Sequence, residues 1–247
     1  MQLRLTHHPR RYLLAILLIS VVLRVAVALY LGNVVDAPEL LTDQRSYHGL
    51  GTRLIEGHGF SFEKHWYPFT QAEEPTSHWS FLYSLLVAGV YSVTGAHPLA
   101  VRLVQAVLGG LLLPWMVYRL TRTVFTDPAP GTGQPVEVFA LVAALIAAVY
   151  PYFVLYAATL MTETLFISIL LWTLERGLTL ANRLRNEPDL RSLWPLGLAL
   201  GVGLGLATLL RQSILPWAPV LFLYLLWLGW RSKRLRVTLM NLGLGGL

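Results

Sequence analysis

The sequence predicts an all-α fold, a polytopic bundle of transmembrane helices. Hydrophobic residues make up 55% of the 247 residues and charged residues only 13%, whereas soluble domains carry about 25% charged residues. Apolar runs of roughly 20 residues recur along the chain, and a helix of that length crosses about 30 Å of hydrocarbon. The chain has no cysteine, so disulfides and thiolate metal sites are excluded.

The apolar runs predict six complete spans. The first run follows a basic N-terminus but lacks a small-residue cleavage site, so it predicts a retained span rather than a signal peptide. The stretch 136–174 is about twice the length of one span, which predicts two spans with a turn around 151–162. The predicted spans are 12–31, 98–118, 136–156, 157–174, 194–211 and 214–230, and a seventh begins at 237.

The run "SFLYSLLVAGVYSVTG", 80–95, is short for a span, and charge decides its assignment. If it does not cross, a cytoplasmic N-terminus leaves thirteen of the nineteen basic residues inside, as the positive-inside rule requires. If it crosses, ten of the thirteen change sides. We therefore predict a juxtamembrane helix. The thirteen are Arg4, Arg10, Arg11, Arg119, Arg122, Arg176, Arg183, Arg185, Arg191, Arg231, Lys233, Arg234 and Arg236.

These short basic clusters between apolar runs are typical of a membrane orientation signal, not of a continuous phosphate-binding face, so we expect no nucleic acid partner. The same topology predicts one large extracytoplasmic loop, 32–97, and minimal other outside connections. Because an elaborated loop often carries function, we expect the chemistry there. The loop holds seven of the thirteen acids, namely Asp36, Glu39, Asp43, Glu56, Glu63, Glu73 and Glu74.

Asp43 opens a predicted amphipathic helix. Tyr47, Leu50 and Leu54 follow it at helical spacing, and the two glycines of "EGHGF" end the helix. Asp is among the best N-terminal cap residues, so Asp43 has a structural interpretation as well as a catalytic one. The two are compatible, because a carboxylate held by a cap is also oriented.

The segment "QAEEPTSHW", 71–79, returns Glu73, Glu74 and His78 to the membrane surface just before the juxtamembrane helix. Together with the other histidines of the loop, these acids could bind a divalent cation. The spacing matches no metal signature, and the alternative interpretation is a solvated polar rim. The histidines considered with them are His48, His58 and His65.

Three arginines outside the basic clusters lie within or at the ends of predicted spans. Arg24 lies mid-span, where a charge costs about 2.5 kcal/mol or more, so we expect it to pair with another helix. Arg102 and Arg211 lie at outside ends of predicted spans. They either extend toward lipid head groups or bind the phosphate of a lipid-linked substrate. Glu163, in "LMTETLF", is either a turn residue or a partner of a substrate hydroxyl or of one of these arginines.

The glycines at 197, 201 and 205 form a small-xxx-small stripe, which predicts a helix-packing face. No strand precedes them, so they do not indicate a nucleotide-binding loop.

The order of these segments resembles a known family. "DQRSY" and "LIEGHGF" follow the first span; "EEPT", "FLYSLL", "HPLAVRLVQAVLGGLLLPWMVYRLTRTVF", "LMTETLF" and "GLATLLRQSILPWAPVLFLYLL" follow in turn. The chain is similar, along essentially its whole length, to the N-terminal half of GT-C type glycosyltransferases of family 39. These include dolichyl-phosphate-mannose protein mannosyltransferases, lipid A aminoarabinose transferases and rhizobial lipopolysaccharide glycosyltransferases.

The resemblance implies an integral membrane enzyme, in the bacterial inner membrane, that moves a sugar from a polyprenyl-phosphate donor to a lipid, glycan or protein acceptor. It implies that Asp43 is the catalytic acid of the first loop and that Glu74, with Glu73 adjacent, is the second. The other candidate substrate contacts are Tyr47, Glu73, His78, Arg102, Glu163 and Arg211.

Two departures from the family pattern stand out. The chain has "SHWS" where many relatives carry a basic or Pro-Pro pair. The resemblance therefore does not imply the detailed contacts around Glu74. Family members are usually about twice as long, so we expect that a C-terminal half is missing.

Two other functions compete with this interpretation. A transporter or flippase for a lipid-linked sugar would favour inverted repeats and ionisable groups at mid-membrane, whereas the acids here gather outside the spans. A non-catalytic scaffold subunit would keep the loop but show no activity.

Overall fold

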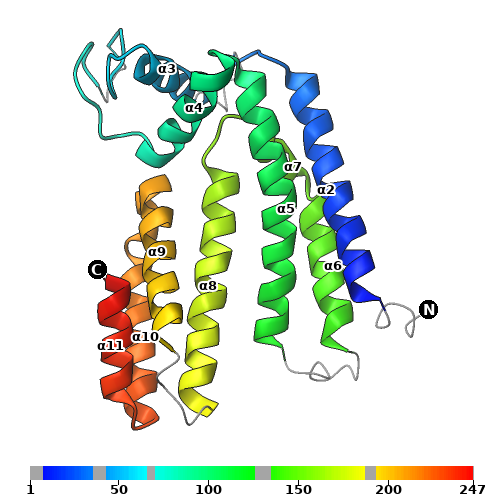
Figure 1. Ribbon diagram of the computed structural model, residues 1–247, viewed down its shortest axis with the longest axis vertical. Helices are drawn as coiled ribbons and strands as arrows, with labels where there is room; N and C mark the ends of the chain where they lie inside the picture. The colour runs from blue at the N-terminus through cyan, green and yellow to red at the C-terminus, as the bar shows by residue number, and fades with distance from the viewer. Residues whose placement is uncertain (1–7, 36–42, 66–69, 126–134, 187–192, 247) are drawn as a thin grey trace. The chain divides into compact units, whose positions relative to one another are not determined.

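The computed structural model describes residues 8–35, 43–65, 70–125, 135–186 and 193–246 (Figure 1). All regular secondary structure in these ranges is helical, and one isolated bridge pairs Ser61 with Pro75. The all-α prediction is confirmed. The chain divides into two compact units. The loop unit consists of the described residues of 13–114 and 145–165, and the C-terminal unit consists of the other described residues.

Each predicted span overlaps a helix or a helix pair, but the fourth, 157–174, is displaced, because the helix there is α8, Glu163–Asn186. Within the described ranges, four helices are long and apolar enough to cross a membrane, or up to five if the bent pair α6–α7 is one span, so six crossings stay a prediction. Helix α9 is shorter, with 17 residues. The helices are α2 (Pro9–Leu31), α5 (Pro98–Val124), α6 (Val136–Val149), α7 (Pro151–Ala157), α8 (Glu163–Asn186), α9 (Trp194–Leu210), the 3-10 turn η3 (Gln212–Ile214), α10 (Trp217–Arg231) and α11 (Leu235–Gly246).

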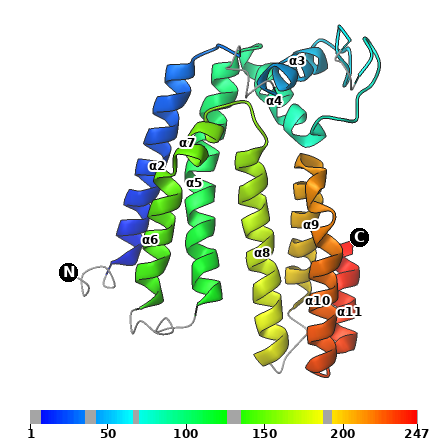
Figure 2. The same cartoon turned by 180° about the vertical axis from the view of Figure 1, so that it is seen from behind.

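The loop between α2 and α5 carries two helices, α3 (Asp43–Ile55) and α4 (Phe81–Thr94), which pack against each other. Gly51 of α3 permits this contact, because a Cβ there would collide with Val87 of α4. The 14 residues of α4 span about 21 Å, which is short of a hydrocarbon layer of about 30 Å. This length agrees with a juxtamembrane helix, and Figure 2 shows α3 and α4 beside the ends of α2 and α5.

Small residues bring α2, α5 and the segment after α7 together in the loop unit. Ala28, Ala106 and Ala158 form one buried cluster. A Cβ on Gly110 of α5 would lie 2.8 Å from the Cα of Val21 in α2, so only glycine allows this approach. Small residues at helix crossings are the usual means of close packing in membranes.

The third predicted span is broken rather than continuous. Tyr150 has an extended backbone (φ −62°, ψ 121°), and Pro151 begins α7 after a bend of 56°. The turn predicted around 151–162 therefore starts later, because Pro is favoured in the first turn of a helix and restarts one here. The carbonyls of Ala147 and Ala148 accept hydrogen bonds from the buried Arg24, at 3.2 and 2.7 Å. The expectation that Arg24 pairs with another helix is confirmed.

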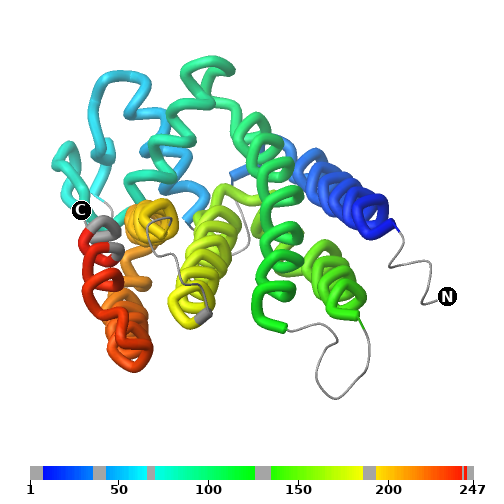
Figure 3. The backbone as a smooth tube through the Cα atoms, turned by 60° about the horizontal axis from the view of Figure 1, so that its bottom comes forward, coloured from blue at the N-terminus to red at the C-terminus, as the bar shows by residue number. Residues whose placement is uncertain are grey.

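In the C-terminal unit, leucines of α8 to α11 form the main apolar core, and α9, α10 and α11 lie side by side (Figure 3). The glycine that packs in α9 is Gly203, whose Cβ would collide with Thr173 of α8. A Cβ on Gly205 would meet nothing within 4 Å among the described residues. The predicted stripe is thus wrong at Gly205, because the contacting face of α9 is rotated toward Gly203.

An ion pair joins the later half of α5 to α8 in the same unit. Arg119 donates to the buried Glu175 at 2.9 Å, and Arg176 also pairs with this carboxylate. Near the end of α5, Arg122 lies 3.4 Å from Glu137 of α6.

Candidate active site

Asp43 is the first residue of α3, as predicted, and is half-buried. The residues directly before it lie outside the described ranges, as do Asp36 and Glu39, so the cap hypothesis stays a prediction. Tyr47 lies one turn further along the same face of α3. Its buried ring meets Tyr83 and Trp79 edge-on, with centroids 4.7 and 5.8 Å apart. The face of α3 that carries Asp43 is therefore fixed against α4 by aromatic packing.

Arg102 of α5 forms hydrogen bonds with the chain at the end of α2 and with the first turn of α3. Its guanidinium donates to the carbonyls of Leu31 at 3.2 Å, Gly32, and Val34 at 2.7 Å, and to Oε1 of Gln44 at 2.9 Å. The first three acceptors are the last residue of α2 and two residues just after it, where carbonyls lack intrahelical partners. Arg102 is only 1% exposed, so this geometry does not support its predicted contact with a donor phosphate.

Two glutamines that the sequence analysis did not single out complete a buried network. Gln105, one turn after Arg102, donates through Nε2 to the carbonyls of Tyr156 (2.8 Å) and Thr159 (2.7 Å) and accepts from the Tyr83 hydroxyl (2.6 Å). Gln44 also accepts from the backbone N–H of Leu160 at 3.2 Å. Polar side chains at helical spacing within an apolar run are the signal that could have identified Gln105.

Glu163 begins α8 and lies near this network, with one carboxylate oxygen buried. Burial raises the pKa of Tyr83 well above its usual value, and nearby Tyr47, Tyr91 and Glu163 raise it further, while Arg102 opposes them. Tyr83 therefore stays protonated and remains a donor to Gln105 at physiological pH.

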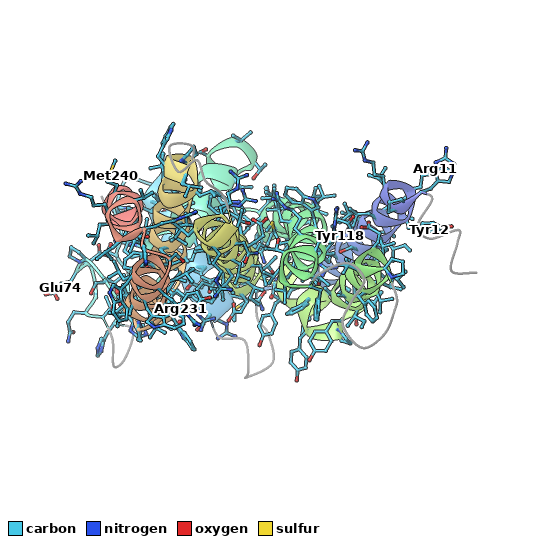
Figure 4. The ribbon with its side chains drawn as sticks, turned by 90° about the horizontal axis from the view of Figure 1, so that it is seen from below. Arg11, Tyr12, Glu74, Tyr118, Arg231 and Met240 are labelled. Atoms are coloured by element: carbon cyan, nitrogen blue, oxygen red, sulfur yellow. The ribbon has the colours of Figure 1, made fainter. Side chains whose placement is uncertain are left out.

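The second acidic segment, which carries Glu73 and Glu74, is joined to α3 by an ion pair. Glu73 pairs with Arg53, which also donates to Ser61 Oγ at 3.1 Å. Glu73 adopts a left-handed backbone (φ 60°), and its side chain is 59% exposed. Glu74 is exposed, and its side chain points outward, away from the helices (Figure 4). His78 is exposed and meets the Trp79 ring edge-on at 5.3 Å.

The histidines do not converge on a metal site. Nδ1 of His48 shares a hydrogen bond with the Tyr91 hydroxyl at 2.8 Å. Burial and the positive charge of Arg102 both lower the pKa of His48, which favours the neutral ring. His58 and His65 are exposed. No group of three His, Asp or Glu side chains that could hold a metal occurs in the part of the chain that the structure describes, so the predicted divalent cation gains no support.

A cavity of about 680 Å³ lies in the loop unit, lined by Phe62 and by polar or charged residues that include His48, Thr52, Arg53, Glu56, Glu63 and Glu73. At about 100° per residue, His48 and Thr52 point to the side of α3 opposite Asp43. The cavity and the Asp43 face are therefore separate features of one helix.

Arg211 belongs to the C-terminal unit. It ends α9 with an extended backbone (φ −152°, ψ 114°), and its N–H donates to the carbonyl of Ala207 at 2.8 Å. The exposed guanidinium lies 5.9 Å from the centroid of the Phe166 ring.

A comparison with protein families matches residues 78–247 to the family described as dolichyl-phosphate-mannose-protein mannosyltransferase. The matched segment covers more than two thirds of the chain and includes His78, Arg102, Glu163 and Arg211. Asp43 and Glu74 precede it. Neither the curated proteins nor the solved structures yielded a match.

Proposed function

Since the chain belongs to the dolichyl-phosphate-mannose-protein mannosyltransferase family, and is thus a membrane glycosyltransferase of the GT-C type, we propose a specific reaction for it. The chain transfers a sugar from a polyprenyl-phosphate donor to a hydroxyl of a lipid, glycan or protein acceptor. The reaction takes place on the extracytoplasmic side of a bacterial inner membrane, with the N-terminus in the cytoplasm.

Asp43 acts as the general base in this proposal. A hydroxyl is a weak nucleophile, and a carboxylate within hydrogen-bond reach accepts its proton as the new bond forms. The acceptor oxygen attacks the anomeric carbon from the face opposite the phosphate. The bond between that carbon and the phosphate oxygen breaks, so the configuration inverts and the polyprenyl phosphate leaves with the electron pair.

Other candidates have supporting roles. Arg211, in the C-terminal unit, is the candidate contact of a donor phosphate, because a guanidinium fork matches phosphate oxygens. Glu163 binds a substrate hydroxyl beside the network of Gln105. Glu74 assists Asp43 or binds the acceptor.

The remaining predicted contacts are weaker candidates. Tyr47 is buried against Tyr83, Glu73 is paired with Arg53, and His78 lies at the surface beside Trp79.

The observation that carries this proposal is the placement of Asp43. A half-buried carboxylate begins a helix whose aromatic face is packed and whose next residue is hydrogen-bonded to α5. Such support holds a catalytic group in one orientation, which is a requirement of an active site.

The test is Asp43→Asn in proteoliposomes supplied with radiolabelled dolichyl-phosphate mannose and undecaprenyl-phosphate mannose. We expect transfer to an acceptor, or release of the sugar to water, to be abolished. Glu56→Gln, an exposed acid just after α3, is the matched control and should keep normal turnover. Near-normal turnover by the Asn variant would refute Asp43 as the base. Label that only changes leaflet would indicate a flippase instead, and an inactive wild type that purifies with a larger partner would indicate a scaffold.

A further inference from the structure

The position of the Asp43 carboxylate depends on what holds the first turn of α3. Gln44, the next residue, is only 2% exposed. Its side chain lies between two hydrogen-bond donors, the Arg102 guanidinium at 2.9 Å and the Leu160 backbone N–H at 3.2 Å. Because both neighbours can only donate, the atom between them must be the amide oxygen.

These two bonds connect separate parts of the loop unit. Arg102 also binds the carbonyls of Leu31, Gly32 and Val34, so the end of α2 and the start of α3 share one anchor on α5. Leu160 lies three residues before Glu163, in the segment that Gln105 holds through the carbonyl of Thr159. The Gln44 oxygen is therefore the point where α3, α5 and the segment before α8 are joined.

Loss of the Gln44 oxygen should be destabilising, because two buried donors would lose this acceptor. A buried donor left without a partner costs about 1–3 kcal/mol, and more when it is charged. Removing the oxygen would strand the Leu160 N–H and one Arg102 N–H together, in a place too buried for bulk water. The first turn of α3 would then shift to find new acceptors.

We infer that Gln44 is a positioning residue, whose amide oxygen, held between Arg102 and the Leu160 N–H, sets the location of the Asp43 carboxylate. The inference rests on the proposed role of Asp43 as the base. Only the acceptor is needed, so a side chain of the same shape with an acceptor oxygen should replace glutamine. A side chain of similar size without one should not.

The test compares Gln44→Glu with Gln44→Leu. Glutamate keeps the shape and an acceptor for both donors, and we expect turnover of polyprenyl-phosphate mannose close to that of the wild type. Leucine fills similar space but accepts nothing. We expect its kcat to fall about 100-fold, as a displacement near 1 Å can cause, with the KM for the donor unchanged. Gln44→Asn, whose oxygen is one methylene short, should fall between them and serves if the leucine variant does not fold.

A second measurement reports position without activity. The chain has no cysteine, so spin labels at Tyr30→Cys and Ile55→Cys, both at exposed sites, measure the distance between the end of α2 and the end of α3. We expect the wild-type distribution in the glutamate variant and a shifted or broader one in the leucine and asparagine variants.

The two measurements separate the possible failures. An unchanged distance in the leucine variant, or a glutamate variant as impaired as the leucine one, would overturn the inference. If Asp43→Asn proves active while the distances change as expected, the position of α3 still depends on Gln44 but the proposed reaction is wrong.

Discussion

Replacing Arg24 tests how the structure satisfies the carbonyls at the break between α6 and α7. In a continuous helix the carbonyl of Ala147 would accept from residue 151, which is a proline without an N–H, and that of Ala148 would accept from residue 152. Arg24 supplies both bonds from α2. Arg24→Leu should leave two carbonyls unpaired, at a cost of about 1–3 kcal/mol each and thus about 4 kcal/mol together.

A single variant cannot isolate this cost, because Arg24→Leu also removes a buried charge. Removal of that charge stabilises the membrane-inserted protein by about 2.5–3.5 kcal/mol. A double-mutant cycle with Pro151→Ala cancels that contribution. Alanine at 151 restores the missing N–H, so the carbonyls have partners within a continuous helix. We expect Arg24→Leu to cost about 4 kcal/mol less in the Pro151→Ala background than in the wild type.

Equilibrium unfolding in mixed micelles with increasing SDS gives the four free energies. Ser20→Ala is the control, since it removes only one hydrogen bond to Arg24, at 2.6 Å, and should cost about 1 kcal/mol. If Arg24→Leu has the same effect in both backgrounds, Arg24 does not compensate for the break, and this explanation of the buried charge fails.

Two further predictions concern packing and pH. Gly110→Ala should destabilise the protein by about 1–3 kcal/mol, because its Cβ would lie 2.8 Å from the Val21 backbone. The control is Gly89→Ala, which should be neutral or stabilising, because a Cβ there meets nothing within 4 Å among the described residues. Thermal unfolding measures both, and equal effects of the two substitutions would contradict the prediction. His48 has a lowered pKa in the folded state, so the unfolded state binds more protons and stability should fall as pH drops through 6.5 and below. His48→Gln should flatten this part of the pH profile, and an unchanged slope would show that other groups cause it.

The helices were predictable because apolar length and charge distribution depend on local sequence. No knowledge of contacts was needed to predict α2, α4 and α5. The evidence was the apolar run before Gly32, the short 80–95 segment and the distribution of basic residues. The sequence predicted a turn around 151–162, but neither the break at Tyr150 within the third predicted span nor the seven helical residues that follow it. Propensity locates a proline bend, whereas the angle and the continuation depend on packing.

The candidate site was predictable only in part. Helical periodicity predicted a helix that carries Asp43 and Tyr47, and α3 is described from Asp43 to Ile55. The catalytic role of Asp43 was implied by the family resemblance and stays a prediction. Arg102 was predicted either to extend toward lipid head groups or to bind a phosphate, but the carbonyls it binds are backbone groups near residue 32, and backbone acceptors carry no sequence signal. Gln44 was missed because the fold brings the Arg102 guanidinium and the Leu160 N–H to it, whereas the helical spacing of Gln105 after Arg102 was a signal that the sequence did carry.

The pairing of Arg24 with Ala148 has a consequence for biogenesis. The two residues are 124 positions apart, so at about 5–20 residues per second the guanidinium emerges from the ribosome about 6–25 s before its acceptors. The first segment must therefore enter the lipid phase with only Ser20 to bond to, or wait beside the translocon for the third. Photocrosslinking of stalled nascent chains would distinguish these two routes.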